Sequence, residues 1–358
     1  MKRESIIFYG ELYPNTIHGV SISNSMNIKC LYERFNVDII EEKVSLRYHN
    51  IISLNKISHF VKSLLTFSLK NLNNNYKFFY SPVYVSSFGI LKNIFCVLIF
   101  KILNYNSRVI LHFHRGDFLM FTRKKTNRIL FSILKLFVYK FICLSKTQSS
   151  ELKNYGLHNC DVLYNTVLDD FKIKTENKKT RKSTLLSISY ISNYIKEKGI
   201  VELINSVIFL NQKKIQVVLN CYGNYSDLGF ENEIKILIKG HEDYINLNNF
   251  VIGEEKISVI SDSDLIILPS YNEGVPIIML ECLKLGKPII ISNVGYISEF
   301  LGEDYPLYCS PKDYKSIIKS INHYISIDDK VLFSEKLKKI FDKFSFEKHK
   351  FQILKIFN

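Results

Sequence analysis

Glu273-Gly-Val-Pro-Ile-Ile-Met-Leu-Glu281 follows one apolar segment, Leu265-Ile-Ile-Leu268, and precedes another, Ile289-Ile-Ile-Ser292. Pro276 suits the first position of a helix, because the N–H that proline lacks would be unpaired there. The turn Gly286-Lys-Pro suits the end of the same helix. The stretch therefore predicts a strand, an acidic loop, a short helix and a second strand, as in a doubly wound α/β sheet.

Two glutamates mark the place where this unit would bind a ligand. Ligands of open parallel sheets bind beyond the carboxyl ends of the strands, where the N-terminus of a helix offers free N–H groups. Glu273 lies in that loop, and Glu281 follows about two turns along the helix. A carboxylate repels phosphate, so we expect a neutral sugar diol, with about 1.5–3 kcal/mol from each charge-assisted hydrogen bond. The alternative is two solvated glutamates on an ordinary surface helix.

The wider segment Pro269-Ser-Tyr-Asn-Glu-Gly-Val-Pro…Glu281-Cys-Leu-Lys-Leu-Gly-Lys-Pro-Ile-Ile resembles the E-x7-E signature of glycosyltransferase family 4. Members of this family are retaining sugar-nucleotide transferases of GT-B fold, with two Rossmann-like domains that face a cleft. The resemblance implies that Glu273 and the N–H groups of Gly274 and Val275 hold the donor sugar. It also implies that Glu281 holds the ribose diol.

A basic residue stands at the matching place in the first loop of the second half. Lys198-Gly199 follows the apolar segment 185–191 and opens a helical pattern. The pair resembles the family's basic position at the donor diphosphate, where a fixed cation stabilises the charge that develops on the leaving group. The family's arginine, five residues earlier, is Asn193 here, which carries no charge, and Lys196 is a weaker substitute. An ordinary surface lysine at a helix start is the alternative for Lys198.

Two elements of the first half also resemble parts of the family's site. His112 and His114 are two residues apart in a predicted strand, so they share one face. By resemblance His114 faces the donor sugar; the alternatives are a buried structural histidine and a metal ligand, although no third ligand is evident. His112 is expected to be structural. His18-Gly19-Val-Ser resembles the glycine turn whose backbone approaches the diphosphate, with a plain turn as the alternative for Gly19.

Apolar runs of strand length alternate with helix-length segments along the whole chain. We predict strands near residues 6–8, 37–40, 77–80, 109–113, 141–144, 162–164, 185–189, 217–222, 250–252, 265–268 and 289–291. The polar run 172–182 indicates a linker. The predicted plan has an acceptor-side Rossmann-like domain at 1–167, a nucleotide-sugar-binding Rossmann-like domain at 168–340, and a final helix at 341–358. That helix either crosses back to the first domain or packs on the second.

Size, charge and cysteine usage narrow the class of protein. A chain of 358 residues exceeds the roughly 250–300 at which one core stops growing. Its seven scattered cysteines suit a reducing cytoplasm, and neither a secretory signal nor an apolar run of bilayer length is visible. Residues 1–167 hold 22 Lys+Arg and 9 Asp+Glu (22 − 9 = +13), whereas residues 168–358 hold 26 and 25 (+1). Such a field could attract nucleic acid, anionic lipid or a phosphorylated substrate.

These observations and the resemblance predict a retaining, metal-independent glycosyltransferase. It would move a sugar from a nucleoside-diphosphate sugar to a hydroxyl of a lipid-linked glycan in cell-surface polysaccharide biosynthesis, without a cofactor. No metal site is expected, because the one DxD-like element, Asp262-Ser-Asp264, precedes a strand instead of following one. A sugar-nucleotide epimerase of the same fold is the first rival. A nucleic-acid-binding protein is the second, but the aromatics of the basic half follow core spacing instead of forming an exposed stacking ladder.

The basic half also suggests a location. Lys124, Lys125 and Arg128 lie beside the apolar run 129–137. We expect them to dock the chain on the anionic inner face of the cell membrane, as a cytoplasmic peripheral protein, because each basic side chain near such a surface contributes about 1 kcal/mol. The alternative is that the apolar run packs on the sheet and the basic residues stay in solvent.

Overall fold

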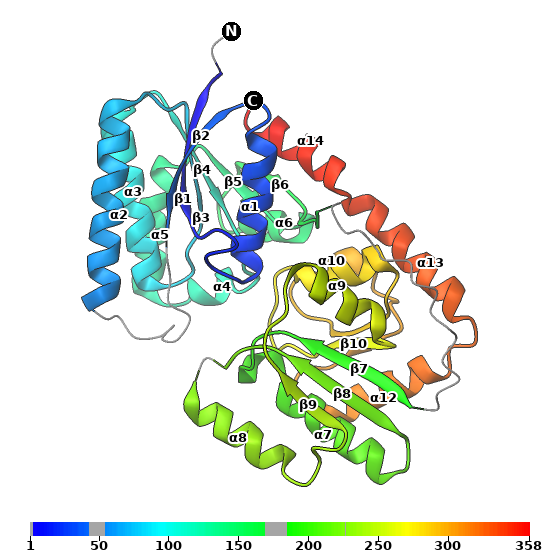
Figure 1. Cartoon of the computed structure of the whole chain (residues 1–358). Helices are drawn as coiled ribbons and strands as arrows, with labels where there is room; N and C mark the ends of the chain where they lie inside the picture. The colour runs from blue at the N-terminus through cyan, green and yellow to red at the C-terminus, as the bar shows by residue number, and fades with distance from the viewer. Residues whose placement is uncertain (1–2, 43–53, 169–184, 226) are drawn as a thin grey trace. The chain divides into compact units, whose positions relative to one another are not determined.

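The structure is a computed structural model that describes residues 3–42, 54–168, 185–225 and 227–358. The predicted linker at 172–182 lies outside these residues. The chain divides into two compact units (Figure 1). The first contains the described residues up to Val167 together with Phe344–Asn358, and the second contains the described residues of Leu168–Lys343.

The first unit is built on a six-stranded parallel sheet of order β2-β1-β3-β4-β5-β6. Its strands are β1 (Ser5–Gly10), β2 (Asn36–Glu41), β3 (Phe78–Pro82), β4 (Arg108–His112), β5 (Lys140–Cys143) and β6 (Cys160–Val162). Its helices are α1 (Gly19–Leu31), α2 (Leu54–Asn73), α3 (Ser87–Leu103), α4 (Phe118–Phe121), α5 (Lys125–Leu134), α6 (Lys146–Asn154) and α14 (Phe346–Ile356), with a 3-10 turn at Lys135–Phe137.

Alternation along the strands gives this sheet two apolar faces. Ile7 and Tyr9 of β1 belong to the core that α2, α3 and α5 cover. Ile6 and Phe8 belong to the opposite core, which includes residues of α1 and α14. Figure 1 shows α2, α3 and α5 together on one face and α1 beside α14 on the other. The sheet is therefore buried on both faces, as a doubly wound unit requires.

The final helix packs on the first unit. Phe357 contacts the rings of Phe35, Phe78 and Tyr80 at centroid distances of 6.2, 5.3 and 5.4 Å. His349 Nε2 lies 2.8 Å from Asn27 Oδ1 of α1. Phe357 of the tail thus belongs to the core of a unit whose other described elements lie between Ser5 and Val162, whereas Phe351 is exposed.

The second unit repeats the plan with a parallel sheet of order β12-β11-β10-β7-β8-β9. Its strands are β7 (Leu186–Ile191), β8 (Val217–Tyr222), β9 (Ile245–Asn248), β10 (Leu265–Leu268), β11 (Ile289–Ser292) and β12 (Tyr308–Cys309). Its helices are α7 (Ile200–Gln212), α8 (Leu228–Ile238), α9 (Gly253–Asp262), α10 (Ile277–Leu285), α11 (Ile297–Leu301), α12 (Tyr314–Ile325) and α13 (Lys330–Phe341), with 3-10 turns at Lys196–Lys198 and Asp342–Phe344.

The strand predictions were wrong at two edges of the second sheet. The strand expected at residues 250–252 is β9, Ile245–Asn248, and Ile252 is instead the N-cap of α9. In β9 the polar Asn246 and Asn248 are exposed, as is usual in an edge strand with one face in solvent. The strand is therefore less apolar than the segment that follows it, and the prediction was placed on that segment. The two-residue β12 was missed because it is too short to show a period.

Candidate active site

Lys198 is held at the end of the loop that follows β7. The Tyr271 N–H donates a 2.8 Å hydrogen bond to the Glu197 carbonyl, which joins this loop to the loop after β10. Gly199 comes next in the left-handed conformation, with φ 72°. A Cβ there would lie 2.1 Å from the carbonyl oxygen of Pro269. Glycine is required for this approach, and it delivers Lys198 to the acidic loop.

Lys198 and Glu273 form an ion pair. Lys198 Nζ lies 2.5 Å from Glu273 Oε1, and the Ser270 hydroxyl donates a 2.7 Å hydrogen bond to the same oxygen. The Glu273 side chain is 10% exposed and that of Lys198 is 26% exposed. Glu273, the residue predicted to bind the sugar, and Lys198, the residue predicted to bind the diphosphate, are thus direct neighbours. Because they are paired with each other, the site is locally neutral.

The helix α10 starts directly behind this pair. It begins at Ile277, one residue later than predicted, because Pro276 is its N-cap and not its first helical residue, and Gly286 ends it with φ 64°. Gly274 and Val275 connect Glu273 to this helix. The strand, acidic loop, helix and strand follow one another as predicted.

Gly295 supports the acidic loop from the next strand. It follows β11 with φ 61°, and a Cβ there would lie 1.9 Å from the Glu273 carbonyl oxygen. The sequence analysis missed this residue. A glycine three positions after a predicted strand was the available signal, but nothing local indicated which loop it would contact.

The ion pair lies at the switch point of the second sheet. From β7 the chain adds β8 and β9 on one side and then crosses to β10 on the other. At such a point the loops that leave two neighbouring strands diverge, and the crevice beyond their carboxyl ends is where ligands of open α/β sheets bind. Lys198 follows β7 and Glu273 follows β10. The topology therefore places both residues in the crevice.

Glu281 has a partner that the sequence analysis did not foresee. It is 6% exposed on α10, and Lys256 Nζ of α9 lies 2.5 Å from its Oε2. A buried carboxylate needs such a cation or a comparable donor, since an unpaired charge there is costly. Lys256 stands in the run Glu254-Glu-Lys256, and its distance along the chain from Glu281 gave no hint of the pairing.

Asn193 lies in the loop after β7, as expected. Its backbone carbonyl, and not its side chain, makes the contact that holds this loop. The buried Tyr190 hydroxyl donates a 3.1 Å hydrogen bond to the Asn193 carbonyl, and burial raises the pKa of Tyr190 well above its usual value. Lys196, the substitute cation, is exposed in the 3-10 turn. The cation that the loop brings to the site is Lys198.

The rings of His112, the last residue of β4, and His114, two residues beyond it, lie side by side. His112 is buried, and its Nδ1 lies 2.9 Å from the Tyr80 hydroxyl. The His114 ring is 4.0 Å from the His112 ring, and burial lowers the pKa of His114 to about 3. Both rings are therefore neutral near pH 7. Among the described residues, His114 Nε2 is buried without a hydrogen-bond partner.

Gly19 is the first residue of α1, and His18 caps the helix. His18 Nδ1 accepts a 3.3 Å hydrogen bond from the Ser21 N–H, and the His18 N–H donates to the Ser21 hydroxyl. His18 Nε2 also lies 2.5 Å from Glu11 Oε2. His18 therefore has a local structural role.

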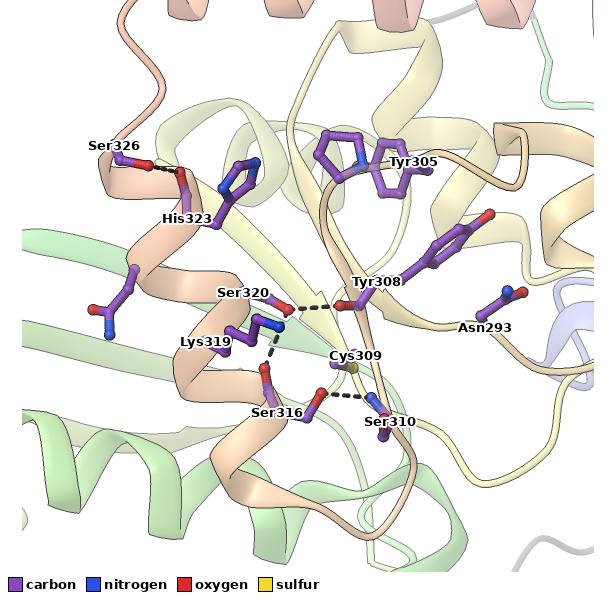
Figure 2. A pocket seen from close by; sticks show the side chains of 12 residues that line it. Asn293, Tyr305, Tyr308, Cys309, Ser310, Ser316, Lys319, Ser320, His323 and Ser326 are labelled. Atoms are coloured by element: carbon purple, nitrogen blue, oxygen red, sulfur yellow. Dashed lines mark hydrogen bonds between the residues drawn. The ribbon is translucent and has the colours of Figure 1, made fainter.

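Three further features of the described residues concern metal binding, membrane crossing and a cavity. These residues contain no group of three or more His, Cys, Asp or Glu that could hold a metal ion, and no helix among them has the length and apolar character needed to cross a bilayer. A cavity of about 740 Å³ lies between β12 and α12 (Figure 2). There Ser320 bonds the Tyr308 carbonyl and Ser316 accepts from the Ser310 N–H, so these wall groups satisfy one another.

The architecture matches solved structures over its whole length. Anabaena HepE, solved in complex with UDP-glucose, superposes with a TM-score of 0.73 at 17% identity, and the match covers 99% of each chain. Two parallel-sheet Rossmann-like units in this order define the GT-B fold, so the chain is a GT-B protein. The fold class expected from the sequence is confirmed.

Residues 171–340 match the family model described as "Glycosyl transferases group 1". A Bacillus subtilis (strain 168) protein named for a glycosyltransferase of teichuronic acid biosynthesis is 27% identical over 135 residues. That match covers 38% of this chain and only 32% of the relative. The N,N'-diacetylbacillosaminyl-diphospho-undecaprenol alpha-1,3-N-acetylgalactosaminyltransferase of Campylobacter jejuni is 23% identical over 273 residues, which is 71% of this chain and 68% of the relative.

Proposed function

We propose that the chain is a retaining, metal-independent glycosyltransferase of cell-surface polysaccharide biosynthesis. It takes a sugar from a nucleoside-diphosphate sugar and transfers it to a hydroxyl of a lipid-linked glycan. The observation that carries the proposal is the Lys198–Glu273 pair at the switch point of the second sheet. One relative is named for teichuronic acid and another for a diphospho-undecaprenol substrate, and both names support this acceptor class.

In this proposal each residue of the site binds a different part of the nucleoside-diphosphate sugar. Lys198 turns from Glu273 to the diphosphate, so that its charge stabilises the leaving group. Glu273, with the backbone of Gly274 and Val275 at the start of α10, then takes the sugar hydroxyls. Glu281, held by Lys256, takes the ribose diol. His114 contacts the sugar, and the loops at Gly19 and Asn193 approach the diphosphate.

Catalysis in this proposal depends on position and charge. The acceptor hydroxyl attacks on the same face of the sugar that the diphosphate leaves, and the departing phosphate takes its proton. The bond to the phosphate oxygen breaks as the bond to the acceptor oxygen forms, so the anomeric configuration is retained. Holding the reactants in this geometry and stabilising the leaving group are the protein's contributions.

The experiment is nucleotide release across a panel of UDP- and GDP-sugars, with a polyprenyl-diphosphate-linked glycan as the acceptor. We expect nucleoside diphosphate only when the acceptor is present, and an α-linked product from an α-linked donor. Epimerisation of the donor without acceptor would favour the sugar-nucleotide epimerase. A salt-sensitive shift of RNA or DNA, with no turnover, would favour the nucleic-acid-binding protein.

We also propose that the first unit docks peripherally on an anionic membrane at its cytoplasmic face. On α5, Phe131 and Leu134 pack into the core, while Ile129 and Ile133 are 52% and 41% exposed beside the basic residues. On α2, a row of aliphatic side chains one turn apart is exposed: Ile57, Val61, Leu65, Leu69 and Leu72. The sequences of α2, α3 and α5 contain no Asp or Glu. Apolar side chains among unopposed basic ones fit an anionic bilayer.

A further inference from the structure

The first sheet has its own switch point. From β1 the chain adds β2 on one side and then crosses to β3 on the other, as it crosses from β7 to β10 in the second sheet. The corresponding crevice lies beyond the carboxyl ends of β1 and β3. Tyr9 precedes the last residue of β1, and Tyr84 follows β3 by two residues.

A buried ion pair lies at this point. Lys92 of α3 contacts Glu42, the residue that follows β2, and their side chains are 10% and 12% exposed. Lys92 Nζ also stands 4.5 Å from the centre of the Tyr84 ring and 5.8 Å from that of Phe88. Each switch point of this chain therefore carries a Lys–Glu pair: Lys92–Glu42 in the first sheet and Lys198–Glu273 in the second.

Tyr84 is held rigidly above the pair. Its N–H donates a 3.0 Å hydrogen bond to Asn93 Oδ1, and Asn93 Nδ2 donates to the Pro82 carbonyl. A Cβ on Gly89 would lie 2.4 Å from the Tyr84 Cβ, so the glycine allows α3 to pack against this residue. The backbone and the Cβ of Tyr84 are therefore held in place by α3.

Three polar atoms of this cluster lack partners. Among the described residues, the Tyr9 hydroxyl, the Tyr84 hydroxyl and Glu42 Oε2 are buried without a hydrogen-bond partner of good geometry, and the side chains of Tyr84 and Glu42 lie near enough to interact with each other. A buried polar group left unsatisfied costs about 1–3 kcal/mol, and native proteins keep few of them. Three such atoms in one cluster indicate polar groups that a ligand could satisfy.

We infer that Tyr9, Glu42, Tyr84 and Lys92 form a second sugar-binding site, which holds a glycosyl unit of the acceptor. The chemistry favours a neutral polyol, because Glu42 already neutralises Lys92 and an anion would meet the free carboxylate oxygen. A sugar hydroxyl can donate to Glu42 Oε2, and two others can pair with the phenol groups. The exposed edges of Tyr84 and Phe88 offer apolar contact to the ring of a sugar.

The phenol groups keep their protons in this environment. Burial, reinforced by the charge of Glu42, raises the pKa of both Tyr9 and Tyr84 well above the usual value. Each hydroxyl therefore remains able to donate as well as accept across the physiological range.

This inference rests on the proposed transferase function, because it assigns the acceptor side of that reaction. The full chain is tested with methyl glycosides of glucose, galactose, N-acetylglucosamine and N-acetylgalactosamine as probes, in the presence of UDP. Binding is followed by saturation-transfer difference NMR, and UDP binding by calorimetry. The variants are Tyr84→Phe, Tyr9→Phe and Glu42→Gln. The matched control is Tyr76→Phe, since the hydroxyl of this buried tyrosine bonds Asp38 at 2.7 Å before β3 begins.

We expect Tyr84→Phe and Tyr9→Phe each to weaken glycoside binding about fivefold or more, the scale of one lost hydrogen bond. Their melting temperatures should stay level or rise, because an unsatisfied hydroxyl has been removed. Tyr76→Phe should melt earlier and bind glycoside as the wild type does. Glu42→Gln should lose glycoside binding if it folds; the two phenylalanine variants decide the matter if it does not.

Glycoside affinity unchanged in both phenylalanine variants, or no glycoside bound by the wild type, would overturn the inference. UDP binding separates this outcome from failure of the proposed function. A wild type that binds neither UDP nor UDP-sugars lacks the donor site, whereas intact UDP binding with unaltered glycoside binding in the variants removes only the acceptor assignment.

Discussion

The Glu273 carboxylate shares one oxygen with Lys198 and Ser270, and the loop that carries it is supported by Gly199 and Gly295 through close backbone approaches. The carboxylate is therefore oriented without being part of an apolar core. In the proposed function, the Glu273 carboxylate acts through the hydrogen bonds that its negative charge strengthens. A substitution that removes the charge and keeps the side-chain volume tests this role.

Glu273→Gln is expected to lose most transfer activity while the protein stays folded. The amide keeps the volume and a hydrogen bond to Ser270, but it removes the charge that strengthens bonds to sugar hydroxyls. Nucleotide release measures the first effect and thermal unfolding the second. The exposed Glu233→Gln is the control, and turnover equal to the wild type in Glu273→Gln would contradict the charge-assisted role.

Lys198→Ala is expected to slow transfer by roughly two orders of magnitude or more, the usual effect of losing one stabiliser of a developing anion. The loss should appear in kcat more than in KM, because the leaving group gains its charge in the transition state. Steady-state kinetics with Lys196→Ala as the matched control gives the measurement. An equal loss in both variants would mean that Lys198 has no special place at the diphosphate.

At the scale of elements, α5 has one buried face and one exposed face. Phe131 and Leu134 contribute to the core, and Ile129 and Ile133 do not. The apolar stripe of α5 is wider than its buried face, so part of the stripe is exposed to solvent. The exposed part is close in sequence to Lys124, Lys125 and Arg128. Part of the run therefore packs on the sheet, and the exposed part remains available for the proposed docking.

Replacement of Lys124, Lys125 and Arg128 by Ser is expected to reduce binding to phosphatidylglycerol vesicles at low salt. Each basic side chain near an anionic surface contributes about 1 kcal/mol, and salt screens it within a Debye length of about 10 Å at 0.1 M. Co-sedimentation checks this, with Lys315, Lys336 and Lys339 replaced by Ser as the charge-matched control. Equal binding of the unaltered chain to anionic and phosphatidylcholine vesicles would end the docking proposal.

At the scale of the whole molecule, two sheets of the same plan carry different surfaces. Both are parallel and doubly wound, and both have a Lys–Glu pair at the switch point. The net charge differs, since the first 167 residues hold +13 and the rest +1. The excess of basic residues before residue 168 is what the proposed docking on an anionic membrane requires.

Transfer activity is expected to survive EDTA. The proposed reaction assigns charge stabilisation to Lys198 and to the start of α10, so chelation removes nothing that it uses. Nucleotide release is measured before and after chelation, with manganese and magnesium added back. Complete loss that either metal restores would contradict the metal-independent mechanism.

Much of this protein is determined locally and could therefore be predicted from the sequence. The hydrophobic period and the positions of glycine and proline predicted both ends of β8 and β10 correctly and the start of α10 to within one residue. This was possible because helix ends and buried strands depend on residues that are near in sequence. The pairing of Lys256 with Glu281, the approach of Gly295 to Glu273, and the packing of Phe357 among strands of the first unit were decided by the tertiary structure alone. Those contacts depend on strand order, which brings together residues that are distant in sequence and whose local patterns do not show which of them will meet.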